Sequence, residues 1–337
     1  MFRASACFRV GLLGNPSDGY FGKAIALSLA NFSCEVSLTP SHAVSFQPHP
    51  EHDKEVFSSL EDLSCTCAKY GYTGGIHLLK ATCKKFYDYC RLHQLQGSTK
   101  EKHFSISYDT NIPRQLGLSG SSALIYATVQ ALVEYFGVNI PKHDRPALVL
   151  AVEKEELGIN AGWMDRVIQV WGGLCYMDFA GLSSGGHLEC IPLDPKLLPP
   201  LDLIWADSPS ESGKVHSRVR QRWMDGDPEI VQGMQQAAKC AEEGRVALQD
   251  GNWPKIAHLM NTNFDLRRKM FGDAVIGEAN IKMVEVARSV GAACKFAGSG
   301  GAVVAFCPLG VEQRHSLQQA ATNNGFHIAP VEVAPAQ

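Results

Sequence analysis

Residues 113–135 read PRQLGLSGSSALIYATVQALVEY, and this stretch decides how the rest of the chain is interpreted. A loop rich in Gly and Ser leads into a long run of strong helix formers that starts at Ala123. Gly117 and Gly120 permit torsions and close approaches that a side chain would block, and the serines lie where a helix N-cap is expected. Free N–H groups and the positive end of the helix dipole then converge on one point, which favours phosphate. An ordinary capped core helix is the alternative that this segment leaves open.

The composition is that of an ordinary globular enzyme. The 337 residues are enough for two domains, with 45% hydrophobic and 19% charged residues. The formal net charge of -3 predicts no nucleic-acid partner, because dedicated nucleic-acid binders carry a basic stripe. Any anionic ligand must therefore be held by local groups rather than by the field of the whole protein.

The cysteines and the N-terminal residues predict a cytoplasmic protein. The 11 cysteines are odd in number and scattered, and no two have CxxC spacing, so we expect free thiols in a reducing compartment. Charged Arg9 comes before any long apolar run can build. We therefore expect neither a signal peptide nor a membrane partner.

Hydrophobic patterns predict helices and strands in both halves without the regular spacing of a doubly wound sheet, which favours an α+β fold. The segment at 181–200 is rich in Gly, Ser and Pro and separates two predicted domains, 1–198 and 199–337. Strands are expected at 7–13, 34–38, 103–108, 165–170, 174–179, 201–206 and 326–333. Helices are expected at 76–93, from Ala123 to just before Gly137, and at 145–157, 228–248, 253–271, 277–290 and 315–324.

Two further Gly-rich segments accompany the opening loop, at residues 11–22 and 297–301. Neither Lys23 nor Lys214 belongs to a Walker-type loop, because the upstream glycine and the following Ser or Thr are missing. The Rossmann fingerprint is also absent from every expected strand-to-helix turn. These two common nucleotide-binding folds are therefore disfavoured.

The segment PRQLGLSGSSALIYA resembles the phosphate-binding signature of the GHMP kinases, the family of galactokinase, homoserine kinase and mevalonate kinase. The segments SACFRVGLLGNPSD and KFAGSGGAVVAF fall where the first and third motifs of that family belong. The resemblance implies a two-domain α+β fold of the GHMP-kinase type. Its N-terminal, ATP-binding domain would contain a left-handed βαβ unit, and its C-terminal domain would be ferredoxin-like.

Within this family the resemblance is strongest to the glucuronokinases. It is carried by the turn GNPSD, the run EELGINAGWMDRVIQVWGGLCYMDF and the segment SGKVHSRVRQRW. The implied reaction is transfer of the ATP γ-phosphoryl group to the anomeric hydroxyl of D-glucuronate. Galactokinases carry an acidic-His turn in place of Asn15-Pro16, which disfavours galactose. The alternatives are a GHMP kinase with a hexose or heptose phosphate acceptor, and a non-catalytic sugar or ATP sensor.

The resemblance also assigns ATP and Mg²⁺ to particular residues. Backbone N–H groups of the opening loop would bind the ATP phosphates, and the hydroxyl of Ser122 would bind Mg²⁺ together with Glu153. For Glu153 the alternative is a solvated helix end, because two more glutamates follow it closely. The residues expected to bind ATP are Pro113, Arg114, Gln115, Leu116, Gly117, Leu118, Ser119, Gly120, Ser121, Ser122 and Ala123.

Asp165 and Arg9 form the expected catalytic pair. Asp165 would bind the sugar hydroxyl and either accept its proton or only orient it, while a surface pair with Arg166 is the alternative. Arg9 interrupts an apolar strand, where a lone charge is costly unless it is paired. It would balance Asp165 and stabilise charge on the transferred phosphoryl group.

The acceptor sugar is expected to contact further charged residues. Asp18 matches a family carboxylate that binds sugar hydroxyls, although its turn could equally use it as an Asx cap. The carboxylate of the substrate needs a cation, ideally the fork of an arginine. The sequence does not choose among the candidates Lys23, Arg166, Lys214 and Arg218.

Overall fold

The computed structural model describes residues 1–53, 74–95, 102–111, 116–207 and 216–337. The chain forms two compact units, each assembled from segments that are separate in the sequence. Strands β1 (Phe2–Leu13) and β2 (Lys23–Pro40) pair with each other and contribute residues to both units. Unit 1 comprises Met1–Cys7, Phe32–Ile112 and Gly120–Ala161, and unit 2 comprises Phe8–Asn31, Pro113–Ser119 and Gly162–Gln337.

Unit 1 combines helices with a small sheet. The Cys34–Pro40 half of β2 pairs antiparallel with β4 (Phe104–Thr110), and β3 (Ser45–Phe46) pairs parallel with β4. The expected helix at 76–93 forms as α2, against which α3 packs through the stacked rings of Phe86 and Phe136, 5.8 Å apart. The helices are α2 (Ile76–Leu92), α3 (Gly120–Phe136) and α4 (Arg145–Ala151), which continues into the π-helical turn η3 (Val152–Glu156).

Unit 2 holds the other half of β2 and a separate four-stranded sheet. Residues Lys23–Leu27 of β2 pair antiparallel with β5 (Leu174–Asp178), and β5 pairs antiparallel with β6 (Glu189–Leu193). Short 3₁₀ turns lie at η1 (Ser17–Tyr20), η4 (Ala180–Ser184) and η5 (Pro195–Leu197). The segment expected to be a linker thus contains a strand of its own.

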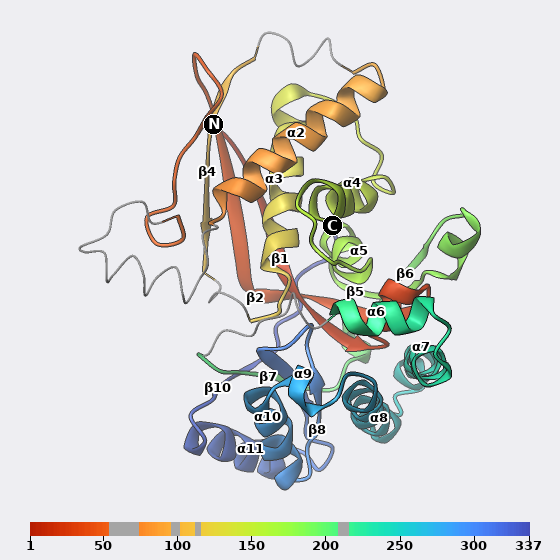
Figure 1. The fold of residues 1–337 in the computed structure, drawn as a ribbon. Coiled ribbons are helices and arrows are strands. Elements are labelled where there is room, and N and C mark those ends of the chain that lie inside the picture. The colour runs from red at the N-terminus through yellow and green to blue at the C-terminus, as the bar shows by residue number, and fades with distance from the viewer. Residues whose placement is uncertain (54–73, 96–101, 112–115, 208–215) are drawn as a thin grey trace. The chain divides into compact units, whose positions relative to one another are not determined.

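The four-stranded sheet has the ferredoxin-like arrangement that the sequence predicts. Its order is β10-β7-β9-β8, with every neighbouring pair antiparallel and helices inserted after the first and third strands. Helices α10 and α11 pack on it (Figure 1), and Phe296 and Val303 lie in their shared core. The strands are β7 (Leu201–Trp205), β8 (Ala293–Phe296), β9 (Ala302–Phe306) and β10 (His327–Pro330). The helices of this region are α6 (His216–Met224), α7 (Pro228–Gln249), α8 (Trp253–Phe271), α9 (Asp273–Ile276), α10 (Glu278–Ser289) and α11 (Val311–Asn323).

The predicted domain boundary after residue 198 falls just before β7, the first strand of this sheet, and it stays a prediction. The left-handed βαβ unit likewise stays a prediction.

The strand expected at 165–170 is wrong, because this segment is the helix α5 (Met164–Trp171). The alternation of Arg166, Ile168 and Val170 with other residues suggested a strand, but nearly every side chain here is buried. The helical face made by Met164, Val167 and Ile168 packs against the small residues of β2 and against β5. Asp165 therefore lies in the first turn of a helix, where the helix dipole favours a carboxylate.

Candidate active site

Arg9 joins three segments of unit 2 through one buried guanidinium group. The residue is 4% exposed on β1. Its Nε donates to Asp165 Oδ1 at 2.6 Å and its Nη2 donates to Asp165 Oδ2 at 2.8 Å. Its Nη1 donates to the carbonyl oxygens of Gly117 and Ala297, at 2.8 and 3.2 Å. The structure thus places the two expected catalytic residues in a bidentate ion pair that also holds two of the Gly-rich loops.

Asp165 is held as an ionised carboxylate. Burial alone would raise the pKa of Asp165. The charges of Arg9 and Arg166, with hydrogen bonds from Arg9 and from Ser119 Oγ at 3.0 Å, outweigh burial and lower the pKa to about 2. Arg166 is itself buried and donates to the carbonyl oxygen of Gly162 at 3.0 Å. The alternative of a surface pair between Asp165 and Arg166 is therefore wrong.

Asp18 has the opposite electrostatic behaviour. It is 8% exposed in η1, and its Oδ2 accepts a hydrogen bond from the backbone N–H of Met164 at 3.1 Å. Burial and the nearby charge of Asp165 raise the pKa of Asp18 to about 6, against the smaller effects of Met164, Arg166 and Arg9. A Cβ atom at residue 162 would collide with Asp18 Oδ2, which explains the glycine there. Two carboxylates with pKa values pushed apart are a frequent feature of active sites.

The loop that precedes α3 is shaped for close backbone approach. Gly117 and Ser119 both have left-handed torsions, with φ of 64° and 68°. A Cβ atom at Gly117 would collide with the carbonyl oxygen of Gly300, and one at Gly298 would collide with the carbonyl oxygen of Gly117. The second and third Gly-rich loops are therefore in direct contact, and both need glycine where they touch.

Two buried cations that the sequence analysis did not single out support these loops. Arg267 of α8 donates to the carbonyl oxygens of Gly298 at 2.6 Å and Ser299 at 3.2 Å. Lys295 of β8 donates through Nζ to the carbonyl oxygen of Gly11 at 2.6 Å and to Asn15 Oδ1 at 2.8 Å. Burial, together with neighbouring positive charge, lowers the pKa of both residues. Both cations therefore position backbone rather than pair with a carboxylate.

Each of these cations left a signal in the sequence. Lys295 interrupts an apolar strand, as Arg9 does, so the same argument applies to it. Arg267 lies on the helical face of Met260, Phe264 and Phe271, which are all buried. Helical periodicity places the next residue, Arg268, on a different side of the helix, where it pairs with Asp273 near the surface.

Unit 1 contains the expected metal ligands. Ser121 Oγ and Ser122 Oγ donate to Glu153 Oε1 at 3.0 and 3.1 Å, and Glu153 is fully buried in η3. The alternative of a solvated helix end applies instead to Glu155 and Glu156, which pair with Lys85 and Lys84.

This donor set fits Mg²⁺, which takes carboxylate and hydroxyl oxygens and ordinarily shares its remaining positions between water and substrate phosphates. Among the described residues, no group of three or more His, Cys, Asp or Glu could hold a metal.

The expected ATP ligands lie partly within the described residues. Leu116 and Leu118 are buried, and Gly120 begins α3, which carries Ala123 in its first turns. Pro113, Arg114 and Gln115 lie outside the described residues.

The cations considered for the substrate carboxylate have different environments. Lys23 Nζ pairs with Glu242 at 2.6 Å and with Asp178 at 3.6 Å. Arg166 is buried beside Asp165, at 3.4 Å. Arg218 is exposed on α6, and Lys214 lies outside the described residues. Lys23 and Arg166 are therefore already neutralised by protein carboxylates.

Sequence comparison identifies the class of protein. Residues 77–173 match the GHMP kinases N terminal domain. A plant protein is 51% identical over 331 residues, which cover 97% of this chain and 91% of that protein. The chain therefore belongs to the GHMP kinase family, and it is an ATP-using kinase that transfers a phosphoryl group to a hydroxyl.

The plant protein is Glucuronokinase 1 of Arabidopsis thaliana. Probable glucuronokinase 2 of the same plant is 49% identical over 340 residues, which cover 99% of this chain and 92% of that protein. The fold is similar to that of Lactococcus lactis galactokinase complexed with galactose, with a TM-score of 0.73 at 15% identity over 100% of this chain and 94% of that one. Within the described parts of the chain, no helix has the length and apolar character needed to cross a bilayer.

Proposed function

We propose that this chain phosphorylates the anomeric hydroxyl of D-glucuronate with ATP, giving glucuronate 1-phosphate and ADP. The observation that carries the proposal is the buried Arg9–Asp165 pair, which is held against two Gly-rich loops. Over nearly its whole length the chain is about half identical to Glucuronokinase 1 and Probable glucuronokinase 2 of Arabidopsis thaliana. Phosphoryl transfer depends mainly on positioning and charge neutralisation, which a rigid ion pair and backbone N–H groups can supply.

Asp165 would orient the acceptor hydroxyl. Because Arg9 and Arg166 hold the pKa of this carboxyl group well below its usual range, it is a weak base before transfer begins. The hydroxyl oxygen forms a bond to the γ-phosphorus while the bond from that phosphorus to the bridging oxygen breaks, and ADP leaves with the electron pair. The hydroxyl proton passes to Asp165 as the new bond forms and then to water. A loose transition state requires little deprotonation beforehand.

Arg9 would stabilise charge both on Asp165 and on the transferred phosphoryl group. A guanidinium group has five N–H donors, and the described residues engage four of those on Arg9. The fifth, on Nη2, is left for an oxygen of the transferred phosphoryl group. Because Asp165 and two carbonyl oxygens fix the group in place, this donor needs no reorganisation when charge develops.

The nucleotide and the metal would use the opening loop and the start of α3. Backbone N–H groups within 113–123 would bind the ATP phosphates. Ser122 and Glu153 would hold Mg²⁺, which neutralises phosphate charge when it is bound. Ser119, which donates to Asp165, and Ser122, which donates to Glu153, are close neighbours in the chain.

The acceptor-binding residue and the cellular location are further parts of the proposal. Asp18 would accept hydrogen bonds from sugar hydroxyls, because its buried carboxylate already accepts one from the N–H of Met164, the residue next to Asp165. We also propose that the protein works in the cytoplasm. The nine cysteines of the described residues are all free thiols, as expected in a reducing compartment.

A panel of acceptors tests the proposal. ADP release is measured with Mg²⁺, ATP and D-glucuronate, D-galacturonate, D-glucose or D-galactose, for the wild type and for Asp165→Ala. We expect the highest kcat/KM with D-glucuronate and no measurable turnover by the variant. A neutral hexose that reacts faster, or ATP binding without turnover on any acceptor, would contradict the proposal.

A further inference from the structure

The proposed substrate carries a carboxylate, and four of the buried or paired cations described above are already engaged. Lys23 and Arg166 already pair with protein carboxylates, and Arg267 and Lys295 are committed to backbone carbonyl oxygens. An enzyme that selects a uronic acid needs a cation near the acceptor turn that is still available to a ligand.

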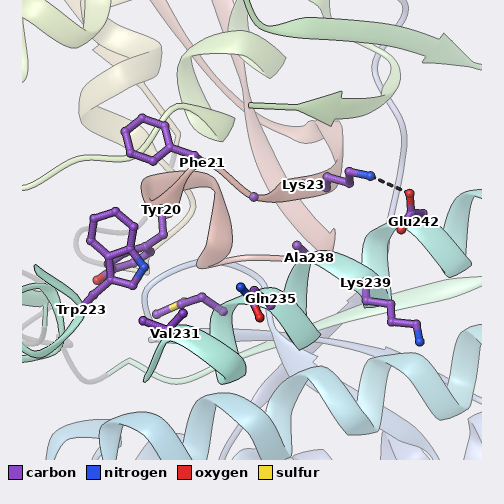
Figure 2. A pocket seen from close by; sticks show the side chains of 11 residues that line it. Tyr20, Phe21, Lys23, Trp223, Val231, Gln235, Ala238, Lys239 and Glu242 are labelled. Carbon is purple, nitrogen blue, oxygen red and sulfur yellow. Dashed lines mark hydrogen bonds and ion pairs between the residues drawn. The ribbon is translucent and has the colours of Figure 1, made fainter. Parts of the chain in front are cut away.

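Aromatic contacts bring α6 to the turn that carries Asp18. Tyr20 is the last residue of η1, and its ring packs edge-to-face on Trp223 of α6 with centroids 5.4 Å apart. The ring of Phe21, which has a left-handed φ of 60°, lies 6.0 Å from the same indole. Figure 2 shows these three rings at one end of a cavity of about 440 Å³ between the turn and α7. The acceptor turn and α6 therefore form one local structure within unit 2.

Arg220 lies one helical turn before Trp223. Residues three apart share a helix face, so Arg220 projects from the side of α6 that packs on Tyr20. It is exposed, and among the described residues no acidic side chain lies within ion-pair distance of it. Two positions further on, Arg222 instead pairs with Asp227 at 2.7 Å and with Glu229 at 2.9 Å.

The electrostatics of Tyr20 agree with this placement. Burial raises the pKa of Tyr20 to about 12. Among the charged groups that act on this phenol, Arg220 has the largest effect and opposes the rise, followed by Asp18 and Arg267. The phenol of Tyr20 thus lies within the electrostatic fields of both Arg220 and Asp18.

We propose that Arg220 binds the carboxylate of the acceptor and thereby selects a uronic acid over a neutral hexose. This inference rests on the proposed function and adds the specificity residue to it. The planar guanidinium fork matches a carboxylate with two parallel hydrogen bonds, which a neutral hydroxymethyl group cannot form. The ring of Tyr20, which packs on Trp223 from the turn that carries Asp18, would line this site.

Kinetics of two variants on two matched substrates test the inference. D-glucuronamide replaces the carboxylate of D-glucuronate with a neutral group of similar shape. For Arg220→Gln we expect kcat/KM on glucuronate to fall about 10- to 100-fold, the loss typical of a charge-assisted hydrogen bond. Activity on glucuronamide and KM for ATP should change less than about 3-fold, because neither involves this charge. Arg220→Lys should recover part of the loss.

Arg218→Gln is the matched control. The sequence also offered Arg218 for the substrate carboxylate, but this exposed arginine lies roughly 200° around the axis of α6 from Arg220 and therefore faces away from Tyr20. We expect wild-type kinetics. Equal activity of Arg220→Gln and Arg218→Gln on glucuronate would overturn the inference, as would an equal loss on glucuronate and glucuronamide. A wild-type enzyme that prefers a neutral hexose would instead refute the proposed function, so the two failures are distinguishable.

Discussion

Replacing Asp18 with Asn should stabilise the folded protein while weakening its activity. The pKa of Asp18 rises from 3.8 to about 6, because the carboxylate is buried beside Asp165. A carboxyl group with a raised folded-state pKa contributes stability that is fully present below its unfolded pKa and is lost as the pH rises through 6. At pH 7.5 the ionised group therefore costs about 3 kcal/mol of unfolding free energy.

The amide avoids this cost without losing the local hydrogen bond. Its Oδ1 can still accept from the N–H of Met164, which lies 3.1 Å from the carboxylate of Asp18. We expect Asp18→Asn to raise the unfolding free energy by about 3 kcal/mol at pH 7.5 and by only about 1 kcal/mol at pH 4.5. Its kcat/KM for glucuronate should fall, since the acceptor loses a charged hydrogen-bond partner.

Denaturant unfolding at the two pH values measures the effect, and Asp165→Asn provides the opposite control. The pKa of Asp165 is lowered to about 2, so its ionised form stabilises the fold above the unfolded pKa, and that stability is lost as the pH falls through 2. Removing this charge from its pair with Arg9 should destabilise the protein by about 3–5 kcal/mol at pH 7.5. A less stable Asp18→Asn protein at pH 7.5, or a gain that is the same at both pH values, would show that the ionised Asp18 carboxylate does not destabilise the fold.

Three further substitutions probe the site. Asp165→Ala should lower kcat at least about 1000-fold in the ADP-release assay while calorimetry finds ATP affinity nearly unchanged, because the acceptor is no longer oriented. Glu153→Gln should raise the Mg²⁺ concentration for half-maximal rate at least about 10-fold, whereas Glu155→Gln, at an exposed ion pair, should leave it unchanged. Gly117→Ala should raise KM for ATP at least about 10-fold, because the added Cβ atom would collide with the carbonyl oxygen of Gly300. Gly137→Ala is the control: its Cβ atom would meet no other atom, so it adds only about 1–2 kcal/mol of left-handed backbone strain. Wild-type ATP kinetics of Gly117→Ala, or an equal metal response of the two Gln variants, would contradict these assignments.

Features that depend on local chemistry were predictable from the sequence. The left-handed torsion at Gly117 agrees with the loop composition, although the second one falls at Ser119 and not at Gly120. The lone charge of Arg9 in an apolar strand required a partner. That this partner is Asp165, far away in the chain, came from the family resemblance, because spacing alone cannot pair such distant residues. The helix α3 formed as expected, since its long apolar run ends at a glycine.

Features that depend on tertiary packing were harder to predict. The segment around Asp165 alternates like a strand but folds as the helix α5. Its side chains are buried on most sides of the helix, so the hydrophobic pattern did not show the period of a helix. The sequence offered several cations for the substrate carboxylate. Only the fold shows that Lys23 is paired with Glu242 and that Arg220 shares a helix face with the indole that packs on Tyr20.

Nuclear magnetic resonance of the reaction product shows directly which sugar oxygen receives the phosphoryl group. The enzyme is incubated with Mg²⁺, ATP and D-glucuronate labelled with ¹³C at the anomeric carbon, and phosphorus–carbon coupling is then recorded. A phosphoryl group on the anomeric oxygen should split the labelled carbon resonance as ADP accumulates, and the Asp165→Ala enzyme should produce no such signal. A phosphorylated product whose anomeric carbon shows no phosphorus coupling, or ADP formation without any sugar phosphate, would contradict the account.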